Sequence, residues 1–217
     1  MDQGYRRWPG PLPPDGGTLD WPASGVHGEY TDPPGEEVTV DPTRKNLEQA
    51  KQPVSPLLAG PYGHPFHPIL VTVPIGAWVC SLVFDIASHR VDRPGFLAQG
   101  SEWLIAIGLV GAVAAAMIGF LDLIVIPRST RAFRVAMVHM ALNLVVTVAY
   151  IANFAWRHSG YPQETAVSFG PLALSVVSLV ALAASGYLGG MLAYRYGVRV
   201  AVEHVQADGF GQSTTTD

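Results

Sequence analysis

The sequence predicts an all-α fold: an integral membrane four-helix up-down bundle with a disordered N-terminal leader. Charged residues make up only 14% of the 217 residues, against roughly 25% in soluble domains. Four long apolar stretches follow the leader, and each reaches the ~20 residues needed to cross a hydrocarbon layer ~30 Å thick. The connections between these stretches are short, which makes neighbouring helices antiparallel.

The apolar stretches divide the chain into three predicted parts. Residues 1–63 form the leader, residues 64–200 a four-helix transmembrane domain, and residues 201–217 a flexible C-terminal tail. The predicted spans are Pro65–Ser88, Phe96–Ile126, Arg134–Trp156 and Pro171–Tyr194.

The predicted leader is polar and rich in proline. The chain before Phe66 holds 12 of the 18 prolines and 9 of the 17 acidic residues. No sustained hydrophobic period runs through it, so the leader is expected to be disordered. A short helix is predicted near Thr43–Gln52. The leader lacks the apolar core of a signal peptide, so the first span is expected to direct insertion.

Basic residues near the helix ends predict the orientation in the membrane. More arginines lie at the end of the bundle that carries both termini than at the opposite end, so both termini are expected in the cytoplasm. The lipid bilayer is the predicted surrounding. The arginines at the terminal end are Arg128, Arg131, Arg134, Arg195 and Arg199, and those at the other end are Arg90, Arg93 and Arg157.

Composition and spacing exclude several classes of function. Cys80 is the single cysteine, which excludes an internal disulfide, a thiolate zinc site and an iron–sulfur ligand set. The net charge of −4 is small and divided between regions, which argues against a nucleic-acid partner. Ser81 and Thr72 have no base at suitable spacing and no phosphate-binding glycine loop is present, so a stand-alone enzyme is not expected.

Ionisable residues inside the spans are costly in lipid and therefore mark candidate sites. The first span opens with His64-Pro65-Phe66-His67-Pro68, and prolines suit the first turn of a helix, which places the predicted helix start at His64. With a rise of ~1.5 Å per residue, Asp122 and His139 fall at matching depth, and His67 lies slightly shallower. Asp122 is expected to accept the Nδ1–H of His139, a pairing that orients histidine ligands.

Further polar residues complete two predicted layers. Asn143 lies four residues after His139 on the same helix face and is interpreted as a link between helices or as part of the site. Tyr194 closes the fourth span, so all four helices are expected to contribute to this layer. At the opposite end, an interfacial hydrogen-bonded cluster is predicted from Asp85, His89 and Glu102.

These residues resemble the motifs of a bacterial membrane protein family, domain of unknown function 2231. The resemblance covers about residues 60–200 and implies a four-helix protein of the bacterial inner membrane, with no established activity. Relatives fused to Rieske iron–sulfur domains suggest redox work. Members often carry glutamate where Met191 stands and histidine where Tyr196 stands, so this chain departs from the family there. The motifs are Gly63-His64-Pro65-Phe66-His67-Pro68 with Pro74-Ile75-Gly76, Gly119-Phe120-Leu121-Asp122, Arg134 with His139 and Asn143, and the stretch Gly186–Val200.

The first hypothesis for this layer is a b-type haem protein of membrane electron transfer with a redox partner. Haem iron accepts axial imidazoles, and a four-helix bundle can hold the ring between facing helices. His67 and His139 are the expected ligands, with His64 as a substitute and Asp122 and Asn143 beside them. Room for the macrocycle is expected from three glycines, Gly111, Gly119 and Gly186.

Two other hypotheses stay open. One is a mononuclear metal site with nitrogen and oxygen ligands from His64, His67, His139 and Asp122. The other is a non-catalytic membrane subunit or scaffold, whose leader docks a partner by folding on binding. The sequence leaves a homodimer open as well.

Overall fold

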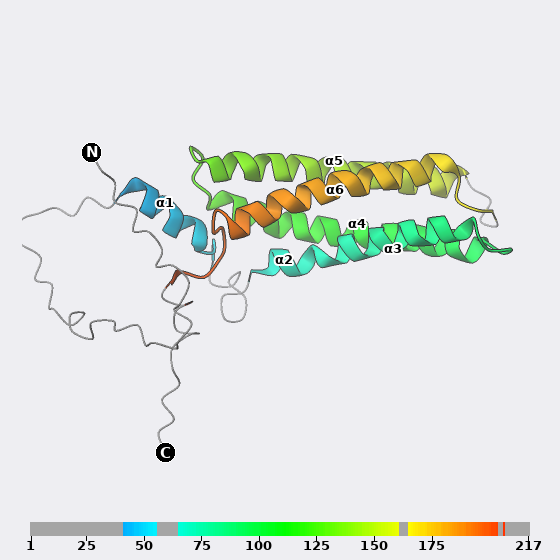
Figure 1. Ribbon diagram of the computed structural model, residues 1–217, viewed down its shortest axis with the longest axis horizontal. Coiled ribbons are helices and arrows are strands. Elements are labelled where there is room, and N and C mark those ends of the chain that lie inside the picture. Colours follow the sequence, from blue (N-terminus) through cyan, green and yellow to red (C-terminus); the bar gives the residue numbers. More distant parts are fainter. Residues whose placement is uncertain (1–40, 56–64, 161–164, 204–205, 207–217) are drawn as a thin grey trace, which may run out of the picture. The chain divides into compact units, whose positions relative to one another are not determined.

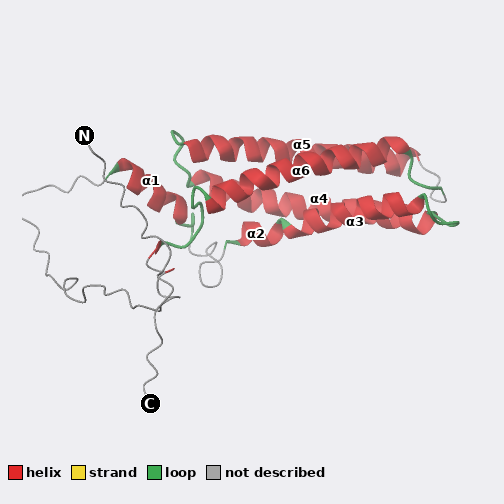
Figure 2. Cartoon of the chain, in the orientation of Figure 1, coloured by secondary structure: helices red, strands yellow, loops and turns green. Residues whose placement is uncertain are grey.

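The computed structural model describes residues 41–55, 65–160, 165–203 and 206. Most of the predicted leader, including His64, and most of the predicted tail lie outside these residues. The described part of the chain is helical and contains no strand (Figures 1 and 2). Its helices are α1 (Pro42–Lys51), α2 (Phe66–Leu70), α3 (Thr72–Ser88), α4 (Gly95–Ile124), α5 (Arg131–Gly160) and α6 (Phe169–Tyr194).

Four helical segments are long and apolar enough to cross a membrane, which confirms the predicted bundle: Phe66–Ser88, Gly95–Ile124, Arg131–Ser159 and Phe169–Tyr194. The third extends beyond its predicted ends, partly because the Thr130 hydroxyl accepts a hydrogen bond from the Phe133 N–H at 3.1 Å and caps the helix early. At ~1.5 Å per residue, the 30 residues of α4 or α5 also reach through the headgroup regions of a bilayer ~40–45 Å thick.

The first span is a short helix followed by a long one. α2 begins at Phe66 with Pro65 as its N-cap, two residues after the predicted start at His64. The break at Val71 follows from Pro74, which has no N–H for the Leu70 carbonyl and whose ring clashes with an undistorted preceding turn. The chain continues because the Val71 N–H still bonds to the His67 carbonyl at 3.1 Å.

The spans pack as two antiparallel hairpins, α3 with α4 and α5 with α6, and contacts of α4 with α5 and of α3 with α6 join them. At the centre the Trp78 ring stacks on Tyr150 with centroids 4.0 Å apart, and Ile105 and Val146 complete this buried cluster. Gly108 is required here, because a Cβ at this position would lie 2.2 Å from Trp78 Nε1. The aromatic stack therefore connects the two hairpins.

The outer faces of the spans are apolar. Only 17–28% of each hydrophobic window is buried within the chain, and large side chains such as Val110 and Val177 are 73% and 66% exposed. Soluble monomers rarely expose contiguous apolar surface on this scale. The pattern is that of helices whose outer surface contacts lipid.

The predicted short helix near Thr43–Gln52 is present as α1. Its N-cap is Asp41, whose carboxylate accepts the Thr43 N–H at 2.9 Å, and Pro42 occupies the first turn. The end of α1 contacts the chain that follows α6: the Arg199 N–H donates to the Ala50 carbonyl at 3.1 Å, and Lys51 pairs with Glu203 at 2.6 Å. The sequence does not predict this contact between the leader and the C-terminal segment.

Candidate functional site

The first candidate residue, His67, lies in α2 and is held against α4. Its Nδ1 lies 2.9 Å from the carbonyl oxygen of Ala115. A carbonyl oxygen can only accept, so Nδ1 is the donor of this hydrogen bond and Nε2 takes no part in it. The ring packs on Gly119, where a Cβ would lie 2.8 Å from Cε1 of the imidazole. Gly119 thus makes room for the histidine itself.

His139 is held in the same manner, but between α5 and α6. Its Nδ1 lies 2.8 Å from the Ser185 carbonyl oxygen, which fixes the proton on Nδ1. The Ser185 hydroxyl lies 3.0 Å from the same nitrogen and 3.3 Å from the His139 carbonyl oxygen. The ring packs closely on Gly189, where a Cβ would lie 3.1 Å from Cε1.

The structure brings the two histidines together from different hairpins. The centroids of the His67 and His139 rings are 6.4 Å apart, and the ring planes are nearly perpendicular at 85°. Metal–imidazole bonds are about 2 Å long, so the ligating nitrogens of two imidazoles that share one metal ion lie at most about 4 Å apart. The spacing of the rings is compatible with that arrangement.

Asn143 lies on the same face of α5 as His139, as the sequence predicts. Its Nδ2 is 3.1 Å from His139 Nε2 and donates to the His139 carbonyl oxygen at 3.0 Å. These hydrogen bonds stay within α5, so in the described residues Asn143 does not link helices through them. Instead, its amide approaches the nitrogen of His139 that would bind a metal.

The expected pairing of Asp122 with His139 is wrong. Asp122 forms an ion pair with Arg199, with 3.0 Å between Oδ1 and Nε, and the His139 N–H bonds to Ser185. Arg199 returns to α4 because the chain after α6 turns sharply at Gly197, with φ of 67°, and at Arg199 itself, with φ of 58°. Asp122 lies three residues after Gly119, which contacts the His67 ring, so it remains part of this end of the bundle.

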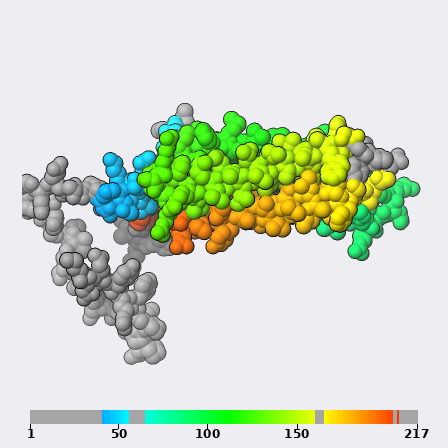
Figure 3. All heavy atoms as spheres, turned by 90° about the horizontal axis from the view of Figure 1, so that it is seen from above, coloured from blue at the N-terminus to red at the C-terminus, as the bar shows by residue number. Residues whose placement is uncertain are grey.

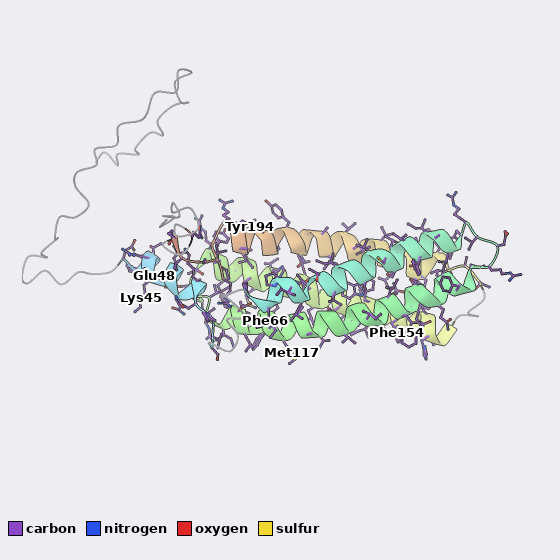
Figure 4. The ribbon with its side chains drawn as sticks, turned by 90° about the horizontal axis from the view of Figure 1, so that it is seen from below. Lys45, Glu48, Phe66, Met117, Phe154 and Tyr194 are labelled. Atoms are coloured by element: carbon purple, nitrogen blue, oxygen red, sulfur yellow. The ribbon has the colours of Figure 1, made fainter. Side chains whose placement is uncertain are left out.

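The contribution of α6 to the layer also differs from the prediction. Tyr194 is 93% exposed and projects away from the bundle (Figure 4). The residue of α6 that contributes to the layer is Ser185, which is buried and contacts His139. A signal for this residue exists in the sequence, since Ser175, Ser178 and Ser185 lie on one helix face and all three are buried.

The predicted cluster at the opposite end is wrong in its partners. Asp85 is fully buried and forms a two-point ion pair with Arg157, at 2.6 and 2.8 Å. The Ser101 hydroxyl donates to Asp85 Oδ1 at 2.5 Å. Arg157 Nε donates to Asn153 at 2.7 Å, and Asn153 donates to the Ser175 hydroxyl at 2.9 Å. Residues from all four spans therefore meet in one buried polar network.

The other two residues of that prediction lie apart from Asp85. Glu102 pairs with His158 at 3.0 Å. His89 is exposed at the C-terminal end of α3, and no side-chain hydrogen bond joins it to Asp85. The pairing expected from the spacing of four residues fails because the buried carboxylate is turned toward α5. The partners of Asp85 in this network, Arg157 and Asn153, are not predicted from the spacing of residues along the chain.

Three glycines were expected to make room for a macrocycle. Gly111 instead accommodates Val73, whose Cγ1 would lie 2.6 Å from a Cβ, and Gly119 accommodates His67. Gly186 faces outward, with no atom within 4 Å of the place of a Cβ. The side chains of Val73 and His67 therefore occupy the space at Gly111 and Gly119. Within the described ranges, no group of three or more His, Cys, Asp or Glu residues is placed to hold a metal ion.

Four apolar helices in two hairpins, with polar side chains gathered at both ends, define an integral membrane protein of the four-span class. The chain belongs to the family of predicted membrane proteins designated DUF2231, which matches residues 63–202. The match includes both histidines and the Asp122–Arg199 pair. Neither the curated proteins nor the solved structures contain a match to the chain.

Proposed function

We propose that this membrane protein binds a b-type haem through His67 and His139 and serves in membrane electron transfer. The observation that carries the proposal is that both imidazoles donate Nδ1–H to a main-chain carbonyl, from Ala115 and Ser185. Metal-binding histidines are oriented in this manner, which leaves Nε2 as the ligand.

Haem requires fewer protein ligands than a bare metal ion. A protein-bound ion such as zinc takes at least three side-chain ligands, so the metal site would need His64 or Asp122 in addition to the two histidines. Haem iron needs only axial ligands from the protein, so the pair of His67 and His139 is sufficient. When bound, haem supplies one-electron redox chemistry of its iron. The chain would orient the ligands and shield them from water.

This role requires two adjustments, because Val73 and the His67 ring fill the space at Gly111 and Gly119 that was expected for the macrocycle, and an amide lies beside the ligating nitrogen of His139. Asn143 Nδ2 lies 3.1 Å from His139 Nε2, so ligation at His139 requires the amide to rotate away. Its second hydrogen bond, to the His139 carbonyl, is local and can be replaced by a new rotamer. An Asn143→Ala variant should therefore bind haem at least as well as the unchanged chain.

A second candidate function is that of a non-catalytic membrane subunit. It is favoured by the close contact of both rings with glycines of neighbouring helices, Gly119 and Gly189. In that case the histidines serve only as hydrogen-bonded links between helices. Their loss would then lower thermal stability without releasing a cofactor.

The test is an absorption spectrum with metal analysis on the full-length protein, purified after haem-replete expression. A Soret band is expected, and it should be lost in His67→Ala and in His139→Ala. His158→Ala is the matched control, because this histidine lies at the opposite end of α5 and is exposed. A colourless protein that retains no iron contradicts the proposal, and a metal without the chromophore indicates the mononuclear site.

We further propose that both termini face the cytoplasm of a bacterial cell, as the five arginines at the terminal end favour. A reporter that is active on only one side of the membrane, fused after Asp217, tests this orientation. Activity of a reporter specific for the outer side would contradict it.

A further inference from the structure

The outer face of α6 carries a hollow that the histidine layer does not use. It is lined by Tyr187, Gly190, Met191, Tyr194 and Arg195. The first four recur at the spacing that places residues on one face of a helix. Gly190 has no atom within 4 Å of the place of a Cβ, and neither does Gly186 one turn earlier. The hollow therefore lies between two tyrosines, where glycine leaves the helix backbone uncovered.

This face points away from the bundle. Tyr187 and Tyr194 are 72% and 93% exposed, whereas Gly189, on another face of the helix, lies against the His139 ring. α6 lies along α5 (Figure 3). Because α6 is one of the membrane-spanning helices, the hollow is open toward the lipid.

The position of the hollow along α6 places it in one leaflet. Arg195 directly follows Tyr194, the last residue of the helix, and therefore stands at the level of the lipid headgroups. Tyrosine is enriched at this depth because its ring is apolar and its hydroxyl is polar. From Tyr194 back to Tyr187 the helix rises ~10 Å, which corresponds to the glycerol region and the first part of an acyl chain.

The charge at this end of the bundle favours an anion. Arg195 is exposed, as are Arg131 and Arg134 at the adjacent start of α5, and no ion pair joins these three to any described residue. The nearby acidic residues are already engaged, because Asp122 pairs with Arg199 and Glu203 with Lys51. Basic residues next to a span attract anionic headgroups, at about 1 kcal/mol per residue.

We propose that this hollow binds one anionic phospholipid, whose phosphate lies at Arg195 and whose acyl chain covers Gly190. The tyrosine hydroxyls at either end can donate hydrogen bonds to the ester and phosphate oxygens. The site requires both a cation at headgroup depth and the missing side chain at Gly190. It involves neither histidine, so it is independent of the proposed haem.

The test measures lipids that the full-length protein retains from bilayers with equal amounts of phosphatidylglycerol and phosphatidylcholine, by mass spectrometry of the intact complex. The unchanged chain should retain phosphatidylglycerol in preference to phosphatidylcholine. Arg195→Gln and Gly190→Leu should each reduce the retained phosphatidylglycerol about fivefold or more. One removes the cation and the other fills the hollow.

Two controls separate the site from general effects. Gly76→Leu introduces the same side chain at another glycine with open space around it, and Arg90→Gln removes an exposed arginine at the opposite end. Both should retain lipid as the unchanged chain does. Equal retention of the two lipids, or undiminished phosphatidylglycerol in Arg195→Gln and Gly190→Leu, would overturn the proposal. It would also fall if Gly190→Leu only converted a dimer to a monomer, because the occupant would then be a second copy.

Discussion

At the scale of single residues, Arg157 shows how the chain keeps a charge inside a membrane bundle. Its guanidinium is 4% exposed and the Asp85 carboxylate is fully buried. Each guanidinium nitrogen has a partner among Asp85, Ser101, Asn153 and Ser175. Buried charges are tolerated when they are paired and fully hydrogen-bonded. The network therefore joins the spans at the end of the bundle opposite the histidines.

Asp85→Ala should be strongly destabilising, because it leaves the Arg157 charge buried without its partner. Breaking a buried pair typically costs 3–5 kcal/mol, whereas replacing both partners by apolar residues is often close to neutral. Thermal unfolding in detergent should show a large fall in Tm for Asp85→Ala and a substantial recovery in the Asp85→Leu/Arg157→Leu double variant. Asp92→Ala, at an exposed position, serves as control. Equal Tm values for Asp85→Ala and the control would contradict the role of the pair.

At the scale of helices, the contact between the hairpins depends on the absence of a side chain at Gly108. The Trp78 indole occupies that space, stacks on Tyr150 of α5 and donates from Nε1 to the Ile105 carbonyl at 3.3 Å. Without this close approach of α3 and α4, the indole would not reach the second hairpin in the same orientation. The stack is thus a consequence of one glycine in α4.

Gly108→Ala should destabilise the bundle, although alanine is the better helix former by about 1 kcal/mol. The new Cβ would lie 2.2 Å from Trp78 Nε1, and such overpacking typically costs 1–3 kcal/mol. A lower Tm and a changed tryptophan emission spectrum are expected. Gly76→Ala adds the same methyl group where there is open space, so its Tm should be unchanged or higher. The reverse order of the two variants would refute the packing argument.

At the scale of the whole described chain, ion pairs tie the segment after α6 to the rest of the protein. Arg199 pairs with Asp122 of α4, with side chains 7% and 19% exposed, and Lys51 of α1 pairs with Glu203. The chain turns after α6 so that the Arg199 side chain meets Asp122. In this turn the Arg199 backbone is in the left-handed region, with φ of 58°. Such a backbone conformation costs about 1 kcal/mol or more for a residue other than glycine. The ion pair offsets that cost.

Arg199→Ala should release this segment, because it removes the ion pair with Asp122 and keeps the unfavourable φ. Limited proteolysis followed by mass spectrometry should show faster cleavage within residues 195–203. Arg44→Ala is the control, since its pair with Glu48 is exposed and such surface pairs contribute little. Cleavage at the same rate in both variants would show that Arg199 does not hold the segment.

The sequence alone determined the four spans and the histidine positions. A hydrocarbon layer imposes a minimum length of apolar helix, so the spans can be read from local composition without knowledge of the neighbours. Depth in the membrane follows from the fixed rise per residue, which explains why His67 and His139 were correctly predicted to lie in one layer.

Only the tertiary structure decided which polar groups are partners. The depth of a residue in the membrane does not determine which face of its helix it lies on or which helix packs against it. Each buried polar group therefore bonds to the partner that packing places within about 3 Å. Asp85 therefore pairs with Arg157 rather than with His89, Asp122 with Arg199, and His139 with a carbonyl of Ser185. These partners are far apart in sequence, and the packing of side chains such as Trp78 on Gly108 sets the distances between them.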